Sequence, residues 1–171
     1  MQGVGNVTDG VLILGATNIP WNLDSAVRRR FEKRIYIPLP EVHARAAMFK
    51  IHIGKTPHTL IDDDFQELGA LTDGFSGSDV NVLVRDALYE PVRALQSSEF
   101  FKMYGDVYIP CSSTDNGAMK MSLMDIDPSK VGVPPLTRKH FNDCLNRVKP
   151  SVSEQDIEMH IEFTNNFGLQ D

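Results

Sequence analysis

A run of arginines near the start of the chain is the segment whose residue types could most directly do chemistry. Five basic residues fall within seven consecutive positions: Arg28, Arg29, Arg30, Lys33 and Arg34. A guanidinium group stays charged, and its planar fork suits phosphate oxygens on which charge develops. Successive residues of a short helix point in different directions. One or two of these arginines could therefore reach an anionic group across a subunit boundary; a solvated basic turn is the alternative.

Asn18 is the second polar candidate, and it follows an apolar run. Residues 11–15 (VLILG) are typical of a strand buried on both faces of a parallel sheet. Ligands lie at the carboxyl ends of such strands. The carboxamide of Asn18 has a donor and an acceptor with which to orient a water molecule there. Asn18 could equally begin an Asx-turn before Pro20.

The elements around these residues look like a piece of a parallel α/β sheet. Asp24 is a suitable N-cap for a short helix through the arginines, and residues 34–39 alternate like a second strand. Two strands leave their faces uncovered. We therefore expect either a truncated chain or strands that find partners elsewhere.

Beyond Pro40 the spacing of apolar residues becomes helical. Ser76 and Asp79 have the spacing of a capping box, and Pro91 should kink the long helix that follows them. Start and stop signals predict helices from Pro40 or Glu41 to Gly54, from Asp62 to Gly74, from Ser76 through Leu95, from Thr137 through Val148, and from Ser153 to Gly168.

A two-residue period replaces the helical one between the long helix and Thr137. Apolar residues alternate with polar ones at Val107, Ile109, Met119 and Met121. Asn116-Gly117 is a strong hairpin signal because both residues tolerate positive φ. This pattern predicts a small β-hairpin inserted into a helical domain, with the proline-rich stretch 128–135 as a connector.

The composition of the chain argues against several classes of function. The net charge of −6 argues against nucleic acid as the main partner. No apolar run approaches the ~20 residues that span a bilayer, and the first ten residues do not resemble a signal peptide. The two cysteines, Cys111 and Cys144, lack metal-ligand spacing, and we expect reduced thiols in a cytosolic protein.

The stretch GATNIPWNLDSAVRRRFEKR, residues 15–34, resembles the second region of homology of AAA ATPases. The resemblance implies that Asn18 is the sensor-one residue, which positions the attacking water near the γ-phosphate. It also implies that Arg29 and Arg30 are arginine fingers that complete the site of the neighbouring subunit. Arg28 lies beside them and would instead hold the helix in place.

The residues that follow resemble the start of the small helical lid of the same class, from FEKRIYIPLPEVHARAAMF to the turn at 74–79. The resemblance implies that Gly77 and Ser78 lie against the adenine, where a helix N-terminus offers backbone donors. It places His52 near the ribose. A simple capped helix and a structural or solvated histidine are the alternatives.

Residues 110–112 and 117–122 resemble the β domain of the vacuolar protein sorting-associated protein four type, and residues 163–168 resemble its C-terminal helix. The implied fold class is an α/β fragment plus a mainly α part: the end of an AAA large domain, a small four-helix lid with a β-hairpin, and a C-terminal helix. The implied boundaries are 1–40 for the large-domain piece, 41–149 for the lid with its insertion at about 104–124, and 150–171 for the last helix.

The 171 residues contain no G-x-x-x-x-G-K-[ST] and no apolar strand that ends in Asp-Glu. The phosphate cradle and the Mg ligands are therefore expected outside this chain, which should be inactive by itself. The resemblance implies a parent ATP hydrolase that uses ATP with Mg and forms a homo-oligomeric ring. That ring would disassemble ESCRT membrane-scission filaments in endosomal and vacuolar sorting.

The resemblance also implies an adaptor protein on the β-hairpin and a cytoplasmic protein recruited to endosomal membranes through its partners; the acidic net charge predicts no nucleic acid among those partners. A non-catalytic helical and β-hairpin interaction module is the alternative.

Overall fold

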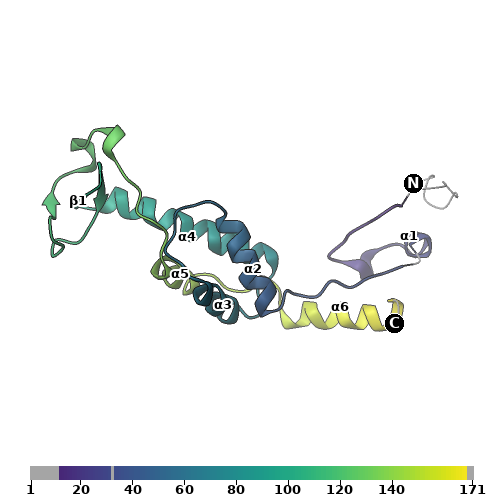
Figure 1. Cartoon of the computed structure of the whole chain (residues 1–171). Coiled ribbons are helices and arrows are strands. Elements are labelled where there is room, and N and C mark those ends of the chain that lie inside the picture. Colours follow the sequence, from purple (N-terminus) through teal and green to yellow (C-terminus); the bar gives the residue numbers. More distant parts are fainter. Residues whose placement is uncertain (1–11, 32, 169–171) are drawn as a thin grey trace. The chain divides into compact units, whose positions relative to one another are not determined.

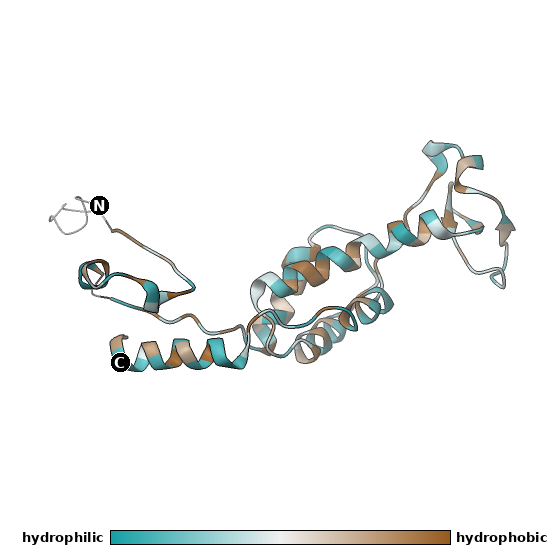
Figure 2. Cartoon of the chain, turned by 180° about the vertical axis from the view of Figure 1, so that it is seen from behind, coloured by the Kyte–Doolittle hydropathy of each residue, from teal (hydrophilic) through white to brown (hydrophobic). Residues whose placement is uncertain are grey.

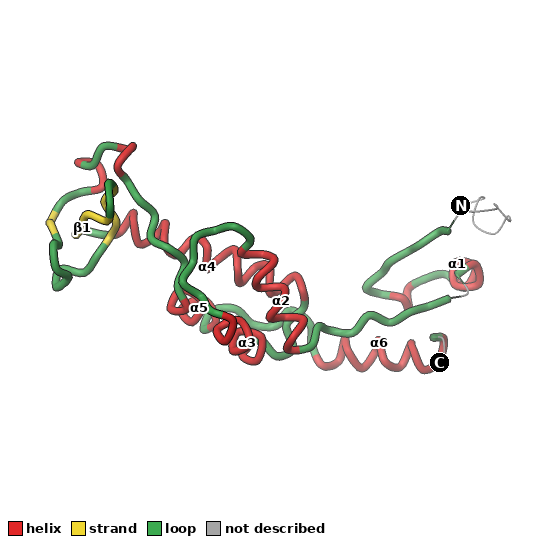
Figure 3. Tube along the Cα trace, viewed as in Figure 1, coloured by secondary structure: helices red, strands yellow, loops and turns green. Residues whose placement is uncertain are grey.

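The computed structural model describes residues 12–31 and 33–168. The chain divides into two compact units (Figure 1). The terminal unit joins residues up to Pro38 with those from Val152 onward, and the central unit runs from Leu39 to Ser151. Helices make up most of the central unit, and its short strands gather around β1 (Figure 3).

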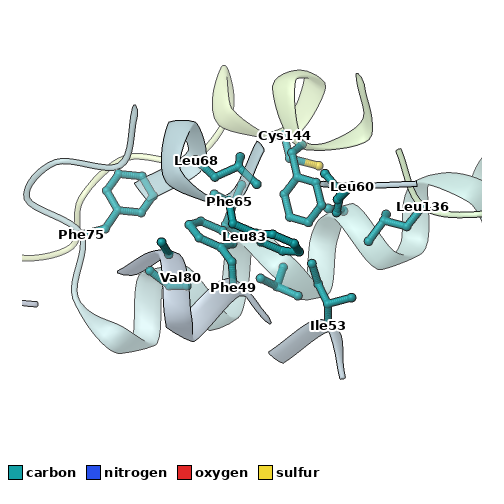
Figure 4. Packing of buried hydrophobic residues seen from close by; sticks show 14 residues of the cluster. Phe49, Ile53, Leu60, Phe65, Leu68, Phe75, Val80, Leu83, Leu136 and Cys144 are labelled. Atoms are coloured by element: carbon teal, nitrogen blue, oxygen red, sulfur yellow. The ribbon is translucent and has the colours of Figure 1, made fainter. Parts of the chain in front are cut away.

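The central unit is held together by four helices around one apolar core. These are α2 (Val42–Ile53), α3 (Asp62–Leu71), α4 (Gly77–Ser97) and α5 (Arg138–Leu145). Each helix carries apolar and polar positions side by side (Figure 2), as expected when only one face is buried. The largest side chains of this core include Phe49, Leu68, Leu83 and Phe141. Figure 4 shows Phe49, Leu68 and Leu83 packed together between the helices. Phe49 and Phe141 meet edge to face, with ring centroids 5.9 Å apart.

The helix boundaries largely follow the predicted signals. Gly54 closes α2 with a φ of 59°, which glycine adopts without a Cβ penalty. Ser76 and Asp79 form the predicted capping box of α4. α3 differs, because Ile61 occupies the N-cap position and Asp62 is the first helical residue. α4 continues through Pro91, so the expected kink does not interrupt the helix.

The predicted strand pairing of the β region, a hairpin closed by Asn116-Gly117, is wrong. β1 (Phe100–Tyr104) is the central strand, flanked by β2 (Val107–Pro110) and β3 (Met119–Lys120), all antiparallel. The hairpin therefore joins β1 and β2, and β2 and β3 are not neighbours. Its turn is Gly105-Asp106, with Gly105 at a φ of 62°.

Gly-Asp between two alternating runs is itself a hairpin signal, which the stronger Asn116-Gly117 signal obscured. Gly117 does adopt a positive φ of 80°, but its turn does not join neighbouring strands. Beneath the sheet lies a second, smaller core formed by Leu95, Phe101 and Ile126. The 3-10 helices η2 (Leu123–Asp125) and η3 (Pro128–Lys130) lead back to α5.

The terminal unit contains η1 (Pro20–Asn22), α1 (Ser25–Arg30) and α6 (Glu154–Phe167). Asp24 caps α1 as predicted, because its carboxylate accepts a hydrogen bond of 2.8 Å from the backbone N–H of Ala26. Ser153 and Asp156 form the capping box of α6, and Gly168 ends that helix.

The two predicted strands of this unit are not strands in the part of the chain that the structure describes. Residues 12–15 and 34–39 run without a ladder, and residue 11 lies outside the described residues. A strand exists only with a hydrogen-bonded neighbour, and these two segments do not pair with each other. Their apolar side chains are exposed as a result, namely Leu12, Leu14, Ile35 and Ile37.

Within residues 12–31 and 33–168, no helix combines the length and the apolar character that crossing a bilayer requires.

Candidate functional site

The predicted site residues fall into both units. Asn18, Arg29 and Arg30 belong to the terminal unit, and His52, Gly77 and Ser78 belong to the central unit. The structure brings together Arg29 with Arg30, and Gly77 with Ser78, as neighbours on single helices.

Asn18 lies in an exposed bend just before η1. The local turn is made by its neighbour, because the hydroxyl of Thr17 accepts a hydrogen bond of 3.1 Å from the backbone N–H of Ile19. An Asx-turn from Asn18 is not formed, because it would need the backbone N–H two residues on and Pro20 has none. Asn18 is exposed, and its carboxamide has both a donor and an acceptor.

The three arginines of α1 have different surroundings. Arg28 is half-buried, and its guanidinium carbon lies 5.0 Å from the ring centroid of Phe167. Arg29 and Arg30 are exposed. All three stand in the last turn of the helix, where cations interact favourably with the helix dipole. The arginines of α1 therefore differ in burial, because Arg28 is half-buried against Phe167 and Arg29 and Arg30 are exposed.

The start of α4 offers two backbone donors. Gly77 and Ser78 are its first residues, and within the described residues no hydrogen bond is formed by the backbone N–H of either one. Such N–H groups at a helix N-terminus are available to a ligand. Their partner would be a hydrogen-bond acceptor placed over the first turn.

The carboxylate of Asp79, in the same first turn of α4, limits which ligand acceptors the N–H groups of Gly77 and Ser78 can bind. Asp79 is buried, and one of its oxygens accepts hydrogen bonds from the backbone N–H of Ser76 at 2.8 Å and of Ser151 at 3.3 Å. Burial alone would raise the pKa of Asp79, but hydrogen bonds from Ser76 and Ser151 outweigh it and hold that pKa below its ordinary value. A fixed negative charge disfavours a phosphate here and leaves a neutral acceptor, such as a ring nitrogen of adenine, as the better match.

His52 lies on the face of α2 that approaches the start of α4. A Cβ placed on Gly77 would meet the methyl carbon of Met48 at 3.5 Å, so Gly77 packs beside Met48. His52 is one turn further along the same helix, and residues four apart share a face. The His52 ring is exposed, so the alternative of a solvated histidine stays open.

Arg45 is a buried residue that sequence reasoning missed. Its guanidinium is 3% exposed and donates to the carbonyl oxygens of Gly69 at 3.0 Å and Pro40 at 2.6 Å, and to the carboxylate of Asp73 at 3.2 Å. The position of Arg45 in the sequence could have indicated its burial, because it lies on the apolar face of α2 that Ala46 and Phe49 define. It ties the start of α2 to the end of α3.

Aromatic contacts between α6 and the first part of the terminal unit were also missed. The ring of His160 lies between Trp21, at a centroid distance of 5.0 Å, and Tyr36, at 5.8 Å. A histidine at a half-buried position on the stripe of α6 was the available signal.

Three known families match consecutive segments of the chain. Residues 1–39 match the ATPase family associated with various cellular activities (AAA). Residues 62–99 match the AAA+ lid domain, and residues 108–168 match the Vps4 C terminal oligomerisation domain.

Individual relatives give the same result. Vacuolar protein sorting-associated protein 4B of Mus musculus is 51% identical over 182 residues, which cover 99% of this chain and 41% of the mouse protein. Vacuolar protein sorting-associated protein 4 of Dictyostelium discoideum is 51% identical, over 98% of this chain and 40% of its own length.

Two solved structures resemble the chain. The crystal structure of Vps4 and Vta1 contains a chain that is 38% identical and matches 65% of this chain and all of its own length, with a TM-score of 0.55. The crystal structure of the FIGL-1 AAA domain is 27% identical and covers 99% of this chain and 49% of its own, with a TM-score of 0.75.

The fold and the matched segments define the class as AAA proteins, here the end of the α/β domain followed by the helical lid, which confirms the predicted fold class. Within that class, the chain belongs to the Vps4 family of AAA ATPases, as the sequence resemblance predicted. The chain spans about two fifths of the length of the curated relatives it matches.

Proposed function

We propose that this chain is the part of an ATP-driven ring that completes the active site of a neighbouring subunit. The ring would disassemble ESCRT membrane-scission filaments in endosomal and vacuolar sorting. The observation that carries the proposal is the difference in exposure among the arginines: Arg29 and Arg30 are exposed at the end of α1, whereas Arg28 is half-buried. An exposed pair on a fixed helix can reach the phosphates of the next subunit.

Each site residue then has one role. ATP with Mg supplies the phosphoryl group that is transferred to water. Asn18 orients that water through its carboxamide, and the two arginines stabilise the negative charge that develops on the transferred group. Gly77 and Ser78 offer backbone N–H groups to the adenine, and His52 lies on the adjacent face of α2 toward the ribose.

The exposed strand-like segments support the same proposal. Leu12 and Leu14 are 90% and 89% exposed, and Ile35 and Ile37 are more than four-fifths exposed. A buried strand of a parallel sheet is apolar on both faces. These segments would become strands by pairing with a sheet that carries the P-loop and the Mg ligands.

Assembly and partners follow from the matched family. The segment 108–168 matches a family described as an oligomerisation domain, which supports a homo-oligomeric ring. Around β1, the apolar side chains of Met103, Tyr104 and Met124 are 51%, 68% and 91% exposed. We propose that an adaptor binds there, that the ring binds ESCRT filament subunits, and that such partners recruit a cytoplasmic protein to endosomal membranes.

The test requires a protein that contains both halves of the site. We define the P-loop fusion as the P-loop-containing part of a Vps4 relative joined to residue 1 of this chain. Replacing Arg29 and Arg30 by Ala should lower kcat by about 10³-fold or more, the usual loss on removing an arginine finger, while nucleotide binding is retained. Arg85→Ala, an exposed arginine on α4, is the matched control and should be neutral.

A mixing experiment shows whether the arginines act in trans. The Arg29→Ala, Arg30→Ala fusion keeps its own P-loop, and a second fusion lacks the P-loop Lys but keeps the arginines. Neither hydrolyses ATP alone, and their mixture should recover activity because the second protein supplies fingers to the first. Lost nucleotide binding in a correctly folded arginine variant would refute the assignment.

The 171-residue chain provides an independent check. It contains no phosphate-cradling loop, so it should show no ATP hydrolysis above background. Measurable turnover that depends on Mg would contradict the proposed division of the active site. It would equally contradict the alternative of a non-catalytic interaction module.

A further inference from the structure

The end of α6 meets the helix that carries the arginine pair. Arg34 donates one hydrogen bond of 2.7 Å to the carbonyl oxygen of Phe167 and a second of 2.7 Å to the carbonyl oxygen of Arg28. Phe167 is the last residue of α6, and Arg28 is in the last turn of α1. One guanidinium group therefore bridges the C-terminal ends of two helices.

The chemistry of helix ends makes this bridge favourable. The last four carbonyl oxygens of an α-helix have no partner inside the helix, and they carry the negative end of its dipole. A planar guanidinium can donate to two acceptors at once while its positive charge faces both helix ends. Arg34 thus satisfies one orphan carbonyl of each helix.

Arg28 also contacts Phe167, through the ring of that residue. Its guanidinium lies over the ring of Phe167, with 5.0 Å from the guanidinium carbon to the ring centroid. This is cation–π geometry, in which the positive guanidinium is attracted to the face of the ring. Phe167 is accordingly held through both its backbone and its side chain.

We propose that Arg28, Arg34 and Phe167 form a clamp that fixes the direction of α1, and with it the direction of Arg29 and Arg30. The three are positioning residues and do not themselves touch a reacting group. The proposal rests on the proposed function, because it takes Arg29 and Arg30 as the fingers. It assigns Arg28 to the clamp and the end of α6 to the control of hydrolysis in the neighbouring subunit.

A clamp is needed because α1 is too short to fix itself. It has six residues, and isolated helices below about 12 residues are marginal in water. Asp24 secures the N-terminal end through its cap. The C-terminal end of α1, which carries Arg29 and Arg30, needs a contact that holds its last turn. The clamp supplies that contact, through the hydrogen bond from Arg34 to the carbonyl oxygen of Arg28.

A separate contact keeps α6 in place when the clamp is altered. His160 lies two turns before Phe167 and packs between Trp21 and Tyr36. Substitutions in the clamp should therefore leave this docking intact. Trp21 is the one tryptophan of the chain, so the fluorescence of the 171-residue protein reports on the docking.

The test compares three variants of Phe167 and Arg34 in the P-loop fusion. Phe167→Ala should lower kcat by about 10–100-fold, because a misplacement of roughly 1 Å in a reacting group costs about that much, while KM for ATP changes less than about threefold. Phe167→Tyr keeps an aromatic ring and should restore kcat. Arg34→Lys cannot donate to both carbonyls in the same planar geometry and should fall between them.

The readouts separate the possible failures. The proposal is supported if kcat falls in Phe167→Ala and recovers in Phe167→Tyr, while the Trp21 emission of the 171-residue chain stays unchanged. A fully active Phe167→Ala fusion beside an inactive Arg29→Ala, Arg30→Ala fusion would overturn the clamp and leave the proposed function standing. A shifted Trp21 emission in Phe167→Ala, matching that of His160→Ala, would overturn it too, because the whole helix would then have moved. Full activity without Arg29 and Arg30 would instead overturn the proposed function.

Discussion

At the scale of single residues, two buried charged side chains in the central unit connect segments that are distant in sequence. Asp79 joins the start of α4 to Ser151, and Arg45 joins α2 to Gly69 and Asp73. Both are more than nine-tenths buried, and each satisfies backbone groups that would otherwise lack partners. Their loss should therefore cost stability well beyond a typical surface substitution.

Asp79→Asn should destabilise the chain by about 1–2 kcal/mol near pH 7, because a charged cap accepting several hydrogen bonds becomes neutral. The pKa of Asp79 is lowered in the folded chain, so its stabilisation is complete above the unfolded pKa of about 4 and is lost as the pH falls through the folded pKa. Urea unfolding at pH 7 and pH 3 checks this. The gap between wild type and variant should narrow at pH 3, whereas Asp63→Asn, an exposed control in α3, should show little change at either pH.

Arg45→Met should destabilise the chain by about 2–4 kcal/mol, because two carbonyl oxygens lose charge-assisted hydrogen bonds while the side-chain volume is roughly kept. Arg45→Lys should lose less, since an ammonium can still donate to one or two of these groups. Chemical denaturation monitored by circular dichroism measures both. Equal stability of Arg45→Met and wild type would show that the buried network contributes nothing net.

At the scale of elements, the turn between β1 and β2 fixes the register of the sheet. Tyr104 pairs with Val107, so only Gly105 and Asp106 lie between the strands. A two-residue hairpin requires positive φ at its first central residue, and Gly105 supplies it at 62°. Phe101, on β1, is fully buried in the smaller core, so a slip of one residue would move it to the other face.

Gly105→Ala should destabilise the β region by about 1 kcal/mol through backbone strain alone. The site isolates that effect, because nothing lies within 4 Å of a Cβ placed there. Gly105→Asn is the matched comparison and should cost less, since Asn tolerates the left-handed region. Denaturant midpoints for the two variants give the result, and a neutral Gly105→Ala would mean that the turn rearranges freely.

At the scale of the whole molecule, the two units differ in how they are stabilised. Every fully buried apolar side chain among the described residues lies in the central unit, from Ala46 to Cys144. The terminal unit is held by contacts between half-buried or exposed residues, such as His160 with Trp21 and Arg34 with Phe167. We propose that residues 39–151 are an independently folding domain.

A protein limited to residues 39–151 should therefore fold and unfold cooperatively, with a Tm within a few degrees of the main transition of the 171-residue chain. The reason is that both apolar cores are complete within it. Differential scanning calorimetry of both proteins makes the comparison. A Tm lowered by about 10 °C or more would mean that the terminal unit contributes substantially to the stability of the central one.

Local signals were enough to predict the helices. Ser76 with Asp79, Gly54 and Gly168 act within one turn of the chain, so their effect can be read from neighbouring residues. The resemblance to AAA ATPases likewise depended on contiguous residues, and it gave the fold class and the family. The assignments of Asn18, Arg29, Arg30, His52, Gly77 and Ser78 stay predictions until they are measured.

The sequence by itself determined where helices begin and end, because caps and glycines act over a few residues. Only the tertiary structure decided which strand pairs with β1, and that residues 12–15 form no ladder, because pairing depends on a partner supplied from elsewhere. It also brought Arg34 to the C-terminal ends of α1 and α6. Arg34 and Phe167 are 133 positions apart, and no local pattern brings such residues together. The tertiary fold brings them together, because the carbonyl oxygens at the C-terminal ends of α1 and α6 both accept hydrogen bonds from the guanidinium of Arg34.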